Sequence, residues 1–554
     1  MKVSIGWLKE LVDLKVSVEE LVKLLPLRTI GAKEVTDQYI ELDMKGYNRA
    51  DLLSLRRVAK EIAVITNSEV KFTQKTPDFS KLYSISVEVE NIQLCPVYCV
   101  AKIENLKIGQ SDKTWKQKLN DSGIRTVNNV ADITNLVMVE YGQPMHAFDA
   151  GKVTGNIGVR VAKKDEKITT LDGKVRNLTP EDLLITDDNG PIGIAGVMGG
   201  KDSGISEGTT SILLEAAIFD PVSIRKTSQK HGLYSEASKR FQHELAKTNL
   251  LEALAAAIKM YEDLGGKLTA LTLVGDTKDK TKVITLSQEK VNSLIGVNIT
   301  PQHLEDSLTK LGFTLASHIG SGNVIWEVTV PYWRQDCNIE EDLIEEVARM
   351  YGYEKIPAKP LTDNIPNMAE KPLFRYIQTL KQASSETGLT EVQTYSYYST
   401  AVLENLLLDK DKLIKLVNPI SAESEYLRDN LWPNLLEAVA KNIRNGIKDV
   451  AIFEIGKAYL IKDGLPDEPH RLAIALSNGS NNPIAELYQI CQTFHLGGGL
   501  DRTPGEFFHP ARSAILEKDG EEVGFIAEIH PRIVNKFGIE QRVAVLEIEI
   551  TTLL

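Results

Sequence analysis

Three polar residues stand out in the stretch Val127–Asp149, because packing alone does not require them: Thr134, Asn135 and His146. An apolar run, Leu136–Val139, and a Gly-Gln-Pro turn separate the Thr-Asn pair from the histidine, so two polar clusters distant in sequence can meet in one pocket. This arrangement favours a recognition site for a small group. A lone histidine is also often a satisfied core residue, and the residues alone leave both interpretations open.

Glu215 is equally unusual, because it lies within the apolar segment ILLEAAIF. A buried carboxylate without a partner costs free energy, so a functional carboxyl group is as well supported here as a structural one. As a hydrogen-bond acceptor it would distinguish ligands with a hydroxyl group from those without one.

Four acidic residues lie close together in RQDCNIEEDLIEEVARMYGY. Asp342, Glu345 and Glu346 are spaced i, i+3 and i+4 and share one face of a predicted helix. Asp336 precedes that helix and can fold back toward it. Four converging carboxylates would suit Mg²⁺, whereas acidic residues in a first helical turn also interact favourably with the helix dipole.

The chain has 554 residues, a formal net charge of −12 and an ordinary globular composition. At about 150 residues per domain, this length predicts roughly three to four domains. Only four cysteines are present, and no second Cys/His pair accompanies Cys95 and Cys99 at zinc-finger spacing. Few cysteines, with no apolar run of about 18 residues, predict a cytoplasmic protein that does not bind membranes.

The net negative charge argues against nucleic acid binding over the whole surface, because polyanions are held chiefly by Lys and Arg. One segment is nevertheless basic, with Arg225, Lys226, Lys230, His231, Lys239 and Arg240 in sixteen positions. Such a cluster indicates either a local RNA-binding face or a solvated helix face.

Apolar periodicity divides the first half of the chain into two predicted domains. Residues 1–75 have a short and a long amphipathic helix on either side of the strand QYIELDM. Residues 76–265 are rich in strands, among which we expect the Thr-Asn/His region, and a helix at roughly 247–264 closes this domain.

Two further domains are predicted in the second half. Residues 283–358 indicate a small module in which a helix begins near Pro301 and the strand VIWEVTVP precedes the acidic helix. Residues 370–554 alternate helices with strands such as VQTYSYYS, LAIALS and VAVLEIEI. The expected fold class is therefore multidomain α+β, with an antiparallel sheet in the last domain.

Seven ordered motifs make the chain resemble the β subunit of bacterial-type phenylalanyl-tRNA synthetase. They are VNNVADITN, YGQPMHAFD, GIAGVMGG, ILLEAAIFDPVSIRKTSQKHGLYSEASKRF, VPYWRQDCNIEEDLIEEVARMYGYEKIP, LRDNLWPNLLEAV and IFEIGKAY. The resemblance implies an editing (B3/B4-like) domain at 76–265, which hydrolyses tyrosine wrongly esterified to the phenylalanine tRNA. It also implies a B5-like module at 283–358 and, at 370–554, a class II synthetase-like fold without active-site motifs.

The resemblance further implies roles for particular residues. Glu215 would accept a hydrogen bond from the tyrosine hydroxyl group, so that bound phenylalanine leaves a carboxylate unpaired, at a cost of roughly 1–3 kcal/mol or more. His146 and Asn135 would position the ester and its attacking water. The positions that match the editing pocket are Thr134, Asn135, Pro144, His146, Gly199, Glu215, Ser235 and Ala237. The positions that match a Mg²⁺ site shared with the α subunit are Asp336, Asp342, Glu345 and Glu346.

Three features depart from the family pattern. The OB-type tRNA-binding insert and the C-terminal ferredoxin-like anticodon-binding domain do not fit into this sequence, so we expect a compact form. Ser235 stands where a threonine is more familiar. The string GGGLDR, Gly497–Arg502, resembles the ATP-contacting third motif of class II synthetases but is not followed by a helix pattern, and Glu454 lacks the paired arginine of the second motif. We therefore expect a glycine-rich loop there and no ATP site in this chain.

The leading hypothesis is a β subunit that scaffolds an (αβ)₂ phenylalanine-tRNA ligase and hydrolyses mischarged tyrosyl-tRNA(Phe), with ATP-dependent synthesis in the α subunit. The alternatives are a stand-alone editing hydrolase that acts in trans and a non-catalytic scaffold with a vestigial pocket.

Overall fold

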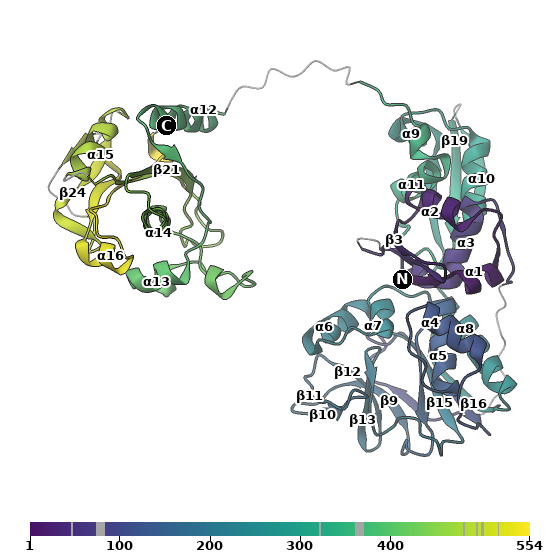
Figure 1. The fold of residues 1–554 in the computed structure, drawn as a ribbon. Coiled ribbons are helices and arrows are strands. Elements are labelled where there is room, and N and C mark those ends of the chain that lie inside the picture. The colour runs from purple at the N-terminus through teal and green to yellow at the C-terminus, as the bar shows by residue number, and fades with distance from the viewer. Residues whose placement is uncertain are drawn as a thin grey trace. The chain divides into compact units, whose positions relative to one another are not determined.

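The chain forms two compact units, Met1–Pro360 and Leu361–Leu554 (Figure 1). The computed structural model describes residues 1–45, 48–73, 84–320, 323–360, 371–479, 482–494, 497–499, 504–518 and 520–553. The predicted domain boundary at residues 75 and 76 and the end of the GGGLDR string lie outside these residues.

Unit 1 begins with a three-stranded antiparallel sheet packed against helices. The strand order is β1 (Lys2–Ser4), β4 (Tyr39–Leu42), β3 (Ala32–Val35). The helices are α1 (Ile5–Leu11), α2 (Val18–Arg28), the short η1 (Ala50–Leu53) and α3 (Leu55–Ile65), and a small pair is formed by β2 (Val12–Asp13) and β5 (Glu69–Val70). The two predicted helices and the predicted strand are confirmed. Only Thr36–Gln38 connect β3 to β4, so no barrel is inserted there.

Two sheets form the framework of the next part of unit 1. The first is antiparallel, with the order β16 (Lys267–Gly275), β7 (Val97–Glu104), β15 (Ile212–Ile218), β8 (Met145–Asp149). The second has the order β14 (Met198–Gly199), β13 (Gly190–Ile194), β12 (Leu183–Asp187), β9 (Ile157–Val161), β6 (Val87–Val89). A separate hairpin consists of β10 (Lys167–Thr169) and β11 (Val175–Asn177).

The two faces of the first sheet contribute to different cores, because side chains alternate along a strand. Leu214 and Ala216 of β15 pack with helices α5 (Asn129–Tyr141) and α8 (Lys247–Asp263) (Figure 1). Leu213 and Ala217 face the other way and pack with residues of the second sheet. The remaining helices are α4 (Lys113–Asp121), α6 (Pro221–His231) and α7 (Glu236–Phe241).

The Thr-Asn region forms helix α5, and our prediction of strand there is wrong. The Asn128 side chain caps the helix by accepting hydrogen bonds from the backbone N–H groups of Val130 and Ala131. Gly142 ends the helix in the left-handed region, with φ of +77°. The four consecutive apolar residues at 136–139 carry no periodicity, so only these two end signals could have identified the helix.

The last part of unit 1 is a three-stranded antiparallel sheet with three helices. Its strand order is β17 (Lys282–Ser287), β19 (Asn323–Val330), β18 (Thr314–Gly320). Its helices are α9 (Gln288–Ile295), α10 (Pro301–Leu311), α11 (Glu340–Tyr351) and the short η2 (Tyr353–Lys355). The predicted helix start at Pro301, the VIWEVTVP strand and the acidic helix are confirmed; β17 and β18 are additional.

Unit 2 contains a seven-stranded sheet with a hydrophobic core on each face. The order is β20 (Thr390–Glu391), β21 (Val450–Lys457), β22 (His470–Ser477), β26 (Ala544–Glu549), β25 (Glu521–Ile529), β24 (Phe508–Lys518), β23 (Gly497–Gly499). Only β20 and β21 pair in parallel. The helices are α12 (Pro372–Glu386), α13 (Thr400–Leu406), α14 (Trp432–Arg444), α15 (Pro483–Gln492) and α16 (Pro531–Lys536), with short turns η3 (Lys410–Lys412), η4 (Ala422–Ser424) and η5 (Thr551–Leu553).

The α+β prediction for this unit is therefore confirmed, with one exception among the predicted strands. VQTYSYYS, residues 392–399, is not a strand and has only an isolated bridge from Tyr397 to Leu427. Tyr395 stacks on Tyr397 with ring centroids 5.0 Å apart, and this aromatic pair produced the strand-like pattern.

Candidate functional site

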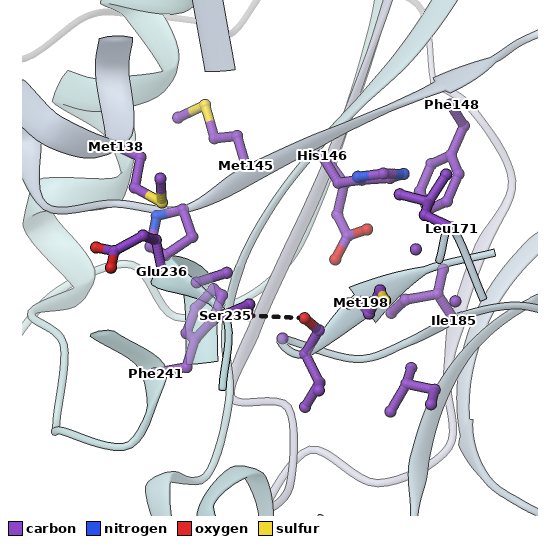
Figure 2. A pocket seen from close by; sticks show the side chains of 18 of the residues that line it. Met138, Met145, His146, Phe148, Leu171, Ile185, Met198, Ser235, Glu236 and Phe241 are labelled. Carbon is purple, nitrogen blue, oxygen red and sulfur yellow. Dashed lines mark hydrogen bonds between the residues drawn. The ribbon is translucent and has the colours of Figure 1, made fainter. Parts of the chain in front are cut away.

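A cavity of about 270 Å³ is bounded by both sheets of the middle part of unit 1 (Figure 2). Strands β8 and β15 contribute one wall, and β12, β13 and β14 contribute the other, with helices α5 and α7 at the sides. All predicted pocket residues except Thr134 line it: Asn135, Pro144, His146, Gly199, Glu215, Ser235 and Ala237.

Glu215 and His146 occupy directly opposite positions on neighbouring strands of the first sheet. Directly opposite residues of an antiparallel pair have Cβ atoms about 4.5–5.5 Å apart and point to the same face. The sheet register therefore presents a carboxyl group and an imidazole side by side to the cavity.

The Glu215 carboxyl group is 7% exposed and has no hydrogen bond or ion pair with any described residue. Burial raises its pKa to about 8, because the charged form loses hydration without a compensating partner. At neutral pH the group is therefore mostly a neutral carboxylic acid.

The His146 imidazole is also without a polar partner. Its Nε2 atom is buried and makes no hydrogen bond within the described part of the chain. The ring packs edge-on against Phe148 with centroids 4.5 Å apart, and Figure 2 shows it beside Phe148 and Leu171. Burial lowers the pKa of His146 to about 4, so the ring is neutral at pH 7 and keeps one nitrogen that can accept a hydrogen bond.

Gly199 is required by the position of His146. A Cβ atom on Gly199 would lie 2.6 Å from Cε1 and 2.7 Å from Nε2 of the imidazole. Any side chain there would force the ring to move. The Gly199 carbonyl oxygen accepts a hydrogen bond from the Leu171 N–H at 3.0 Å, which fixes the backbone beside the ring.

Ser235 links the start of α7 to the other wall of the cavity. Its hydroxyl donates to the Val197 carbonyl oxygen at 2.8 Å, the contact drawn in Figure 2, and accepts from the Ser238 N–H at 3.0 Å. The hydroxyl is therefore used within the fold. Ala237, the second residue of α7, lines the cavity with a methyl group only.

Thr134 does not line the cavity, although its neighbour Asn135 does. The Thr134 hydroxyl donates to the Ala131 carbonyl oxygen at 2.7 Å, and the residue is 8% exposed. On a helix, consecutive residues differ in direction by about 100°, so the two members of the Thr-Asn pair cannot both face one pocket.

The sequence did not indicate most of the apolar lining. Flexible and aromatic side chains cover much of the cavity wall, namely Met138, Met145, Phe148, Leu171, Met198 and Phe241. Methionine adapts to irregular spaces and makes favourable contacts with aromatic rings. The cavity thus suits an apolar ring that carries a polar tip.

The four predicted metal ligands do not converge. Arg334 binds Asp336 through Nη2 at 2.7 Å and Glu346 through Nη1 at 2.5 Å. Asp342 accepts hydrogen bonds from the backbone N–H groups of Asn338 and Ile339 at the start of α11, and Glu345 is exposed. In the described ranges, no three His, Cys, Asp or Glu side chains are arranged to hold a metal ion.

Asp336 and Glu346 belong instead to a buried ion-pair network. Glu346 also binds Arg349 at 2.6 Å, and Arg349 pairs with Glu61 of α3. Glu61 contacts Arg49 at 3.3 Å, and Arg49 binds Asp51 at 2.7 Å. The two arginines beside Glu346 hold its pKa well below the usual range despite burial. The network joins the first and last parts of unit 1.

In unit 2, Glu454 has an arginine partner that sequence spacing did not reveal. Arg428 binds it at 2.9 Å, and Thr394 donates to it at 2.6 Å. Both charged side chains are buried, at 3% and 2% exposure. Gly497–Gly499 form strand β23 rather than the predicted loop.

Three family models match successive parts of the chain. The B3/4 domain matches residues 94–266, the tRNA synthetase B5 domain matches 284–353, and the phenylalanyl tRNA synthetase beta chain CLM domain matches 356–550. Together with the two-sheet cavity, these matches define a protein of the aminoacyl-tRNA synthetase class.

Curated relatives narrow this class. The beta subunit of phenylalanine--tRNA ligase from Staphylococcus saprophyticus is 34% identical over 537 residues, which cover 92% of this chain and 66% of the relative. The corresponding subunit from Aliivibrio fischeri is 33% identical, and the match covers 99% of this chain and 72% of the relative. The chain therefore belongs to the phenylalanine--tRNA ligase beta subunit family.

The chain spans 65–66% of the length of the corresponding subunits from three Staphylococcus species. Within the described residues, no helix is both long and apolar enough to cross a membrane.

Proposed function

We propose that the cavity is an editing site that hydrolyses tyrosine esterified to tRNA(Phe). The observation that carries the proposal is a pair of polar side chains, Glu215 and His146, at opposite positions in one largely apolar cavity. Among the described residues the Glu215 carboxyl group has no hydrogen-bond partner, and neither has the buried Nε2 of His146. A phenol ring fits between the methionine and phenylalanine side chains, and its hydroxyl group would provide the partner that Glu215 lacks.

The state of Glu215 sets how the site distinguishes tyrosine from phenylalanine. The Glu215 carboxyl group is mostly neutral near pH 7. Bound phenylalanine therefore leaves a neutral polar group unpaired rather than a full charge. Leaving this neutral group without a partner costs about 1–3 kcal/mol of binding free energy, and an unpaired carboxylate would cost more. A bound phenol that donates to Glu215 would favour ionisation, so selectivity should increase as the pH approaches 8.

His146 is better suited to position a water than to remove its proton. A general base is most effective when its pKa is near the working pH, whereas burial lowers that of His146 to about 4. The neutral ring can accept a hydrogen bond from the attacking water at Nε2, and Asn135 at the cavity wall can bind the ester carbonyl. The proton would leave with the ribose hydroxyl, the leaving group of the ester.

The expected partners are a phenylalanyl-tRNA synthetase α subunit, in an (αβ)₂ assembly that performs ATP-dependent synthesis, and tRNA(Phe). Family membership and the CLM domain match support this proposal. Four free, buried cysteines support a reducing, cytoplasmic location. A Mg²⁺ site rests on the resemblance alone, because Arg334 neutralises two of the four predicted ligands, and no step above uses a metal.

The proposal predicts that His146→Ala lowers the rate of tyrosine release from tyrosyl-tRNA(Phe) by about 100-fold, the loss typical of a misplaced reactant, measured on the full chain with its α subunit. Gly199→Ala should cause a similar loss, because its Cβ displaces the imidazole. Gly208→Ala is the matched control, since no atom lies within 4 Å of the added Cβ.

Two results would contradict the proposal. Absence of hydrolysis by the wild-type chain would favour a non-catalytic scaffold with a vestigial pocket. Equal hydrolysis rates for the Gly199 and Gly208 variants would show that the reaction does not depend on the position of His146. Full activity without the α subunit would instead support the stand-alone hydrolase.

A further inference from the structure

We propose that the mouth of the cavity is a docking surface for the single-stranded RNA end that carries the ester. This inference rests on the proposed editing function. The surface, called the rim below, comprises Leu171, Lys174, Arg225, Lys226, Lys230 and Tyr234.

Two exposed side chains belong to a residue that lines the cavity and to the chain neighbour of another lining residue. Leu171 lines the cavity yet is 52% exposed, and Tyr234 is 66% exposed and immediately precedes Ser235, which also lines it. Tyr234 makes no hydrogen bond with the described residues. A solvent-facing aromatic ring beside a site that receives a ribose ester is suited to stacking of a nucleobase, which binding sites for single strands commonly use.

The two sides of the rim are tied together by Arg176. Its Nε donates to the Thr170 hydroxyl at 3.1 Å, and its Nη1 donates to the His231 carbonyl oxygen at 3.1 Å. Thr170 precedes Leu171 in the turn between β10 and β11, and His231 is the last residue of α6. The turn that carries Leu171 and the loop that carries Tyr234 are therefore held as neighbours in the folded chain.

The solvent-facing side of α6 supplies positive charge. Arg225, Lys226 and Lys230 are exposed, whereas Ile224 and Thr227 on the opposite side are buried. Arg225 and Lys226 form no ion pair with the described residues, and Lys230 contacts Asp182 at 2.9 Å. Residues 221–241 contain five Lys or Arg and one Glu, in a chain whose net charge is −12.

Among the described residues, none of the carboxylates on these segments pairs with Arg225 or Lys226, because each is bound elsewhere. Asp172 binds Arg176 at 2.7 Å, and Asp220 caps α6 by accepting from the Ser223 N–H. Glu236 binds Lys239 at 2.6 Å and Arg240 at 2.9 Å. A single-stranded RNA whose end enters the cavity therefore fits the rim better than an acidic peptide, because a peptide has no nucleobase that could stack on Tyr234.

The test compares rim variants of the full chain for binding of a short fluorescent single-stranded RNA, measured by anisotropy over a range of salt concentrations. Tyr234→Ala should weaken binding between about 5- and 150-fold, the range found for loss of one stacked base, whereas Tyr234→Phe should bind like the wild type. Lys226→Glu should lower the slope of log K against log salt by about 0.7 for the lost phosphate contact. Lys113→Glu, an exposed lysine on α4, is the matched charge control.

A second readout, calorimetric binding of free tyrosine, separates the rim from the cavity. Rim variants should leave tyrosine affinity unchanged. If Tyr234→Ala and Lys226→Glu left the RNA affinity and the salt slope unchanged, the proposal that the rim binds RNA would be wrong, even if tyrosyl-tRNA is hydrolysed. If RNA binding depended on the rim but the chain did not hydrolyse tyrosyl-tRNA(Phe), the editing proposal would be wrong, whereas the proposal that the rim binds RNA would be supported.

Discussion

Replacing Arg334 by methionine should lower the free energy of unfolding of unit 1 by about 3–5 kcal/mol. Arg334 is 4% exposed and is bound by both Asp336 and Glu346. Removing one member of a buried ion-pair network leaves the others desolvated and uncompensated. Chemical denaturation followed by tryptophan fluorescence measures the loss, because four of the five tryptophans lie in unit 1.

The matched control is Lys259→Met, which removes an exposed ion pair with Asp263. Exposed pairs contribute about 0–1 kcal/mol, so this variant should unfold almost like the wild type. If the Arg334 and Lys259 variants lost equal stability, the network would not join the first and last parts of unit 1.

Glu215→Gln should stabilise unit 1 by roughly 3–5 kcal/mol at about pH 9, with little effect at about pH 4. Burial raises the pKa of Glu215 from its ordinary value of 4.5 to about 8. Below about 4.5 the folded and unfolded states both hold the proton. Between about 4.5 and 8 only the folded state keeps it, so wild-type stability falls as the pH rises through this window. Glutamine has no proton to lose and avoids this cost.

Denaturation midpoints across the pH range measure the difference between variant and wild type. Glu262→Gln, at an exposed position on α8, controls for the loss of a carboxyl group. A constant difference between Glu215→Gln and wild type at all pH values would show that Glu215 is paired or hydrated in the folded chain.

Two cavity residues could be singled out from the sequence because their types were out of place. Glu215 in an apolar strand and His146 after a turn required an explanation, and both face the cavity. Their opposite register on β15 and β8 could not be read from the sequence, since 68 positions separate them. The apolar lining was missed because methionine and phenylalanine in these segments look like ordinary core residues.

The acidic cluster shows the opposite error. Its helical spacing was correct, because Asp342, Glu345 and Glu346 lie on α11. The four carboxylates do not converge on a metal site, because Arg334, two residues before Asp336, binds both Asp336 and Glu346. Arg349 and Glu61, which complete the network, come from one turn further along α11 and from α3, and only tertiary structure reveals such partners.

The central claim is that Glu215 makes the cavity selective for tyrosine. Its most direct test is the ratio of hydrolysis rates for tyrosyl-tRNA(Phe) and phenylalanyl-tRNA(Phe), measured on the full chain with its α subunit, for wild type and Glu215→Ala. The wild type should favour tyrosine by roughly 5- to 150-fold, the equivalent of 1–3 kcal/mol, and the variant should bring the ratio close to one. A wild-type ratio near one, or a ratio that Glu215→Ala leaves unchanged, would contradict this account.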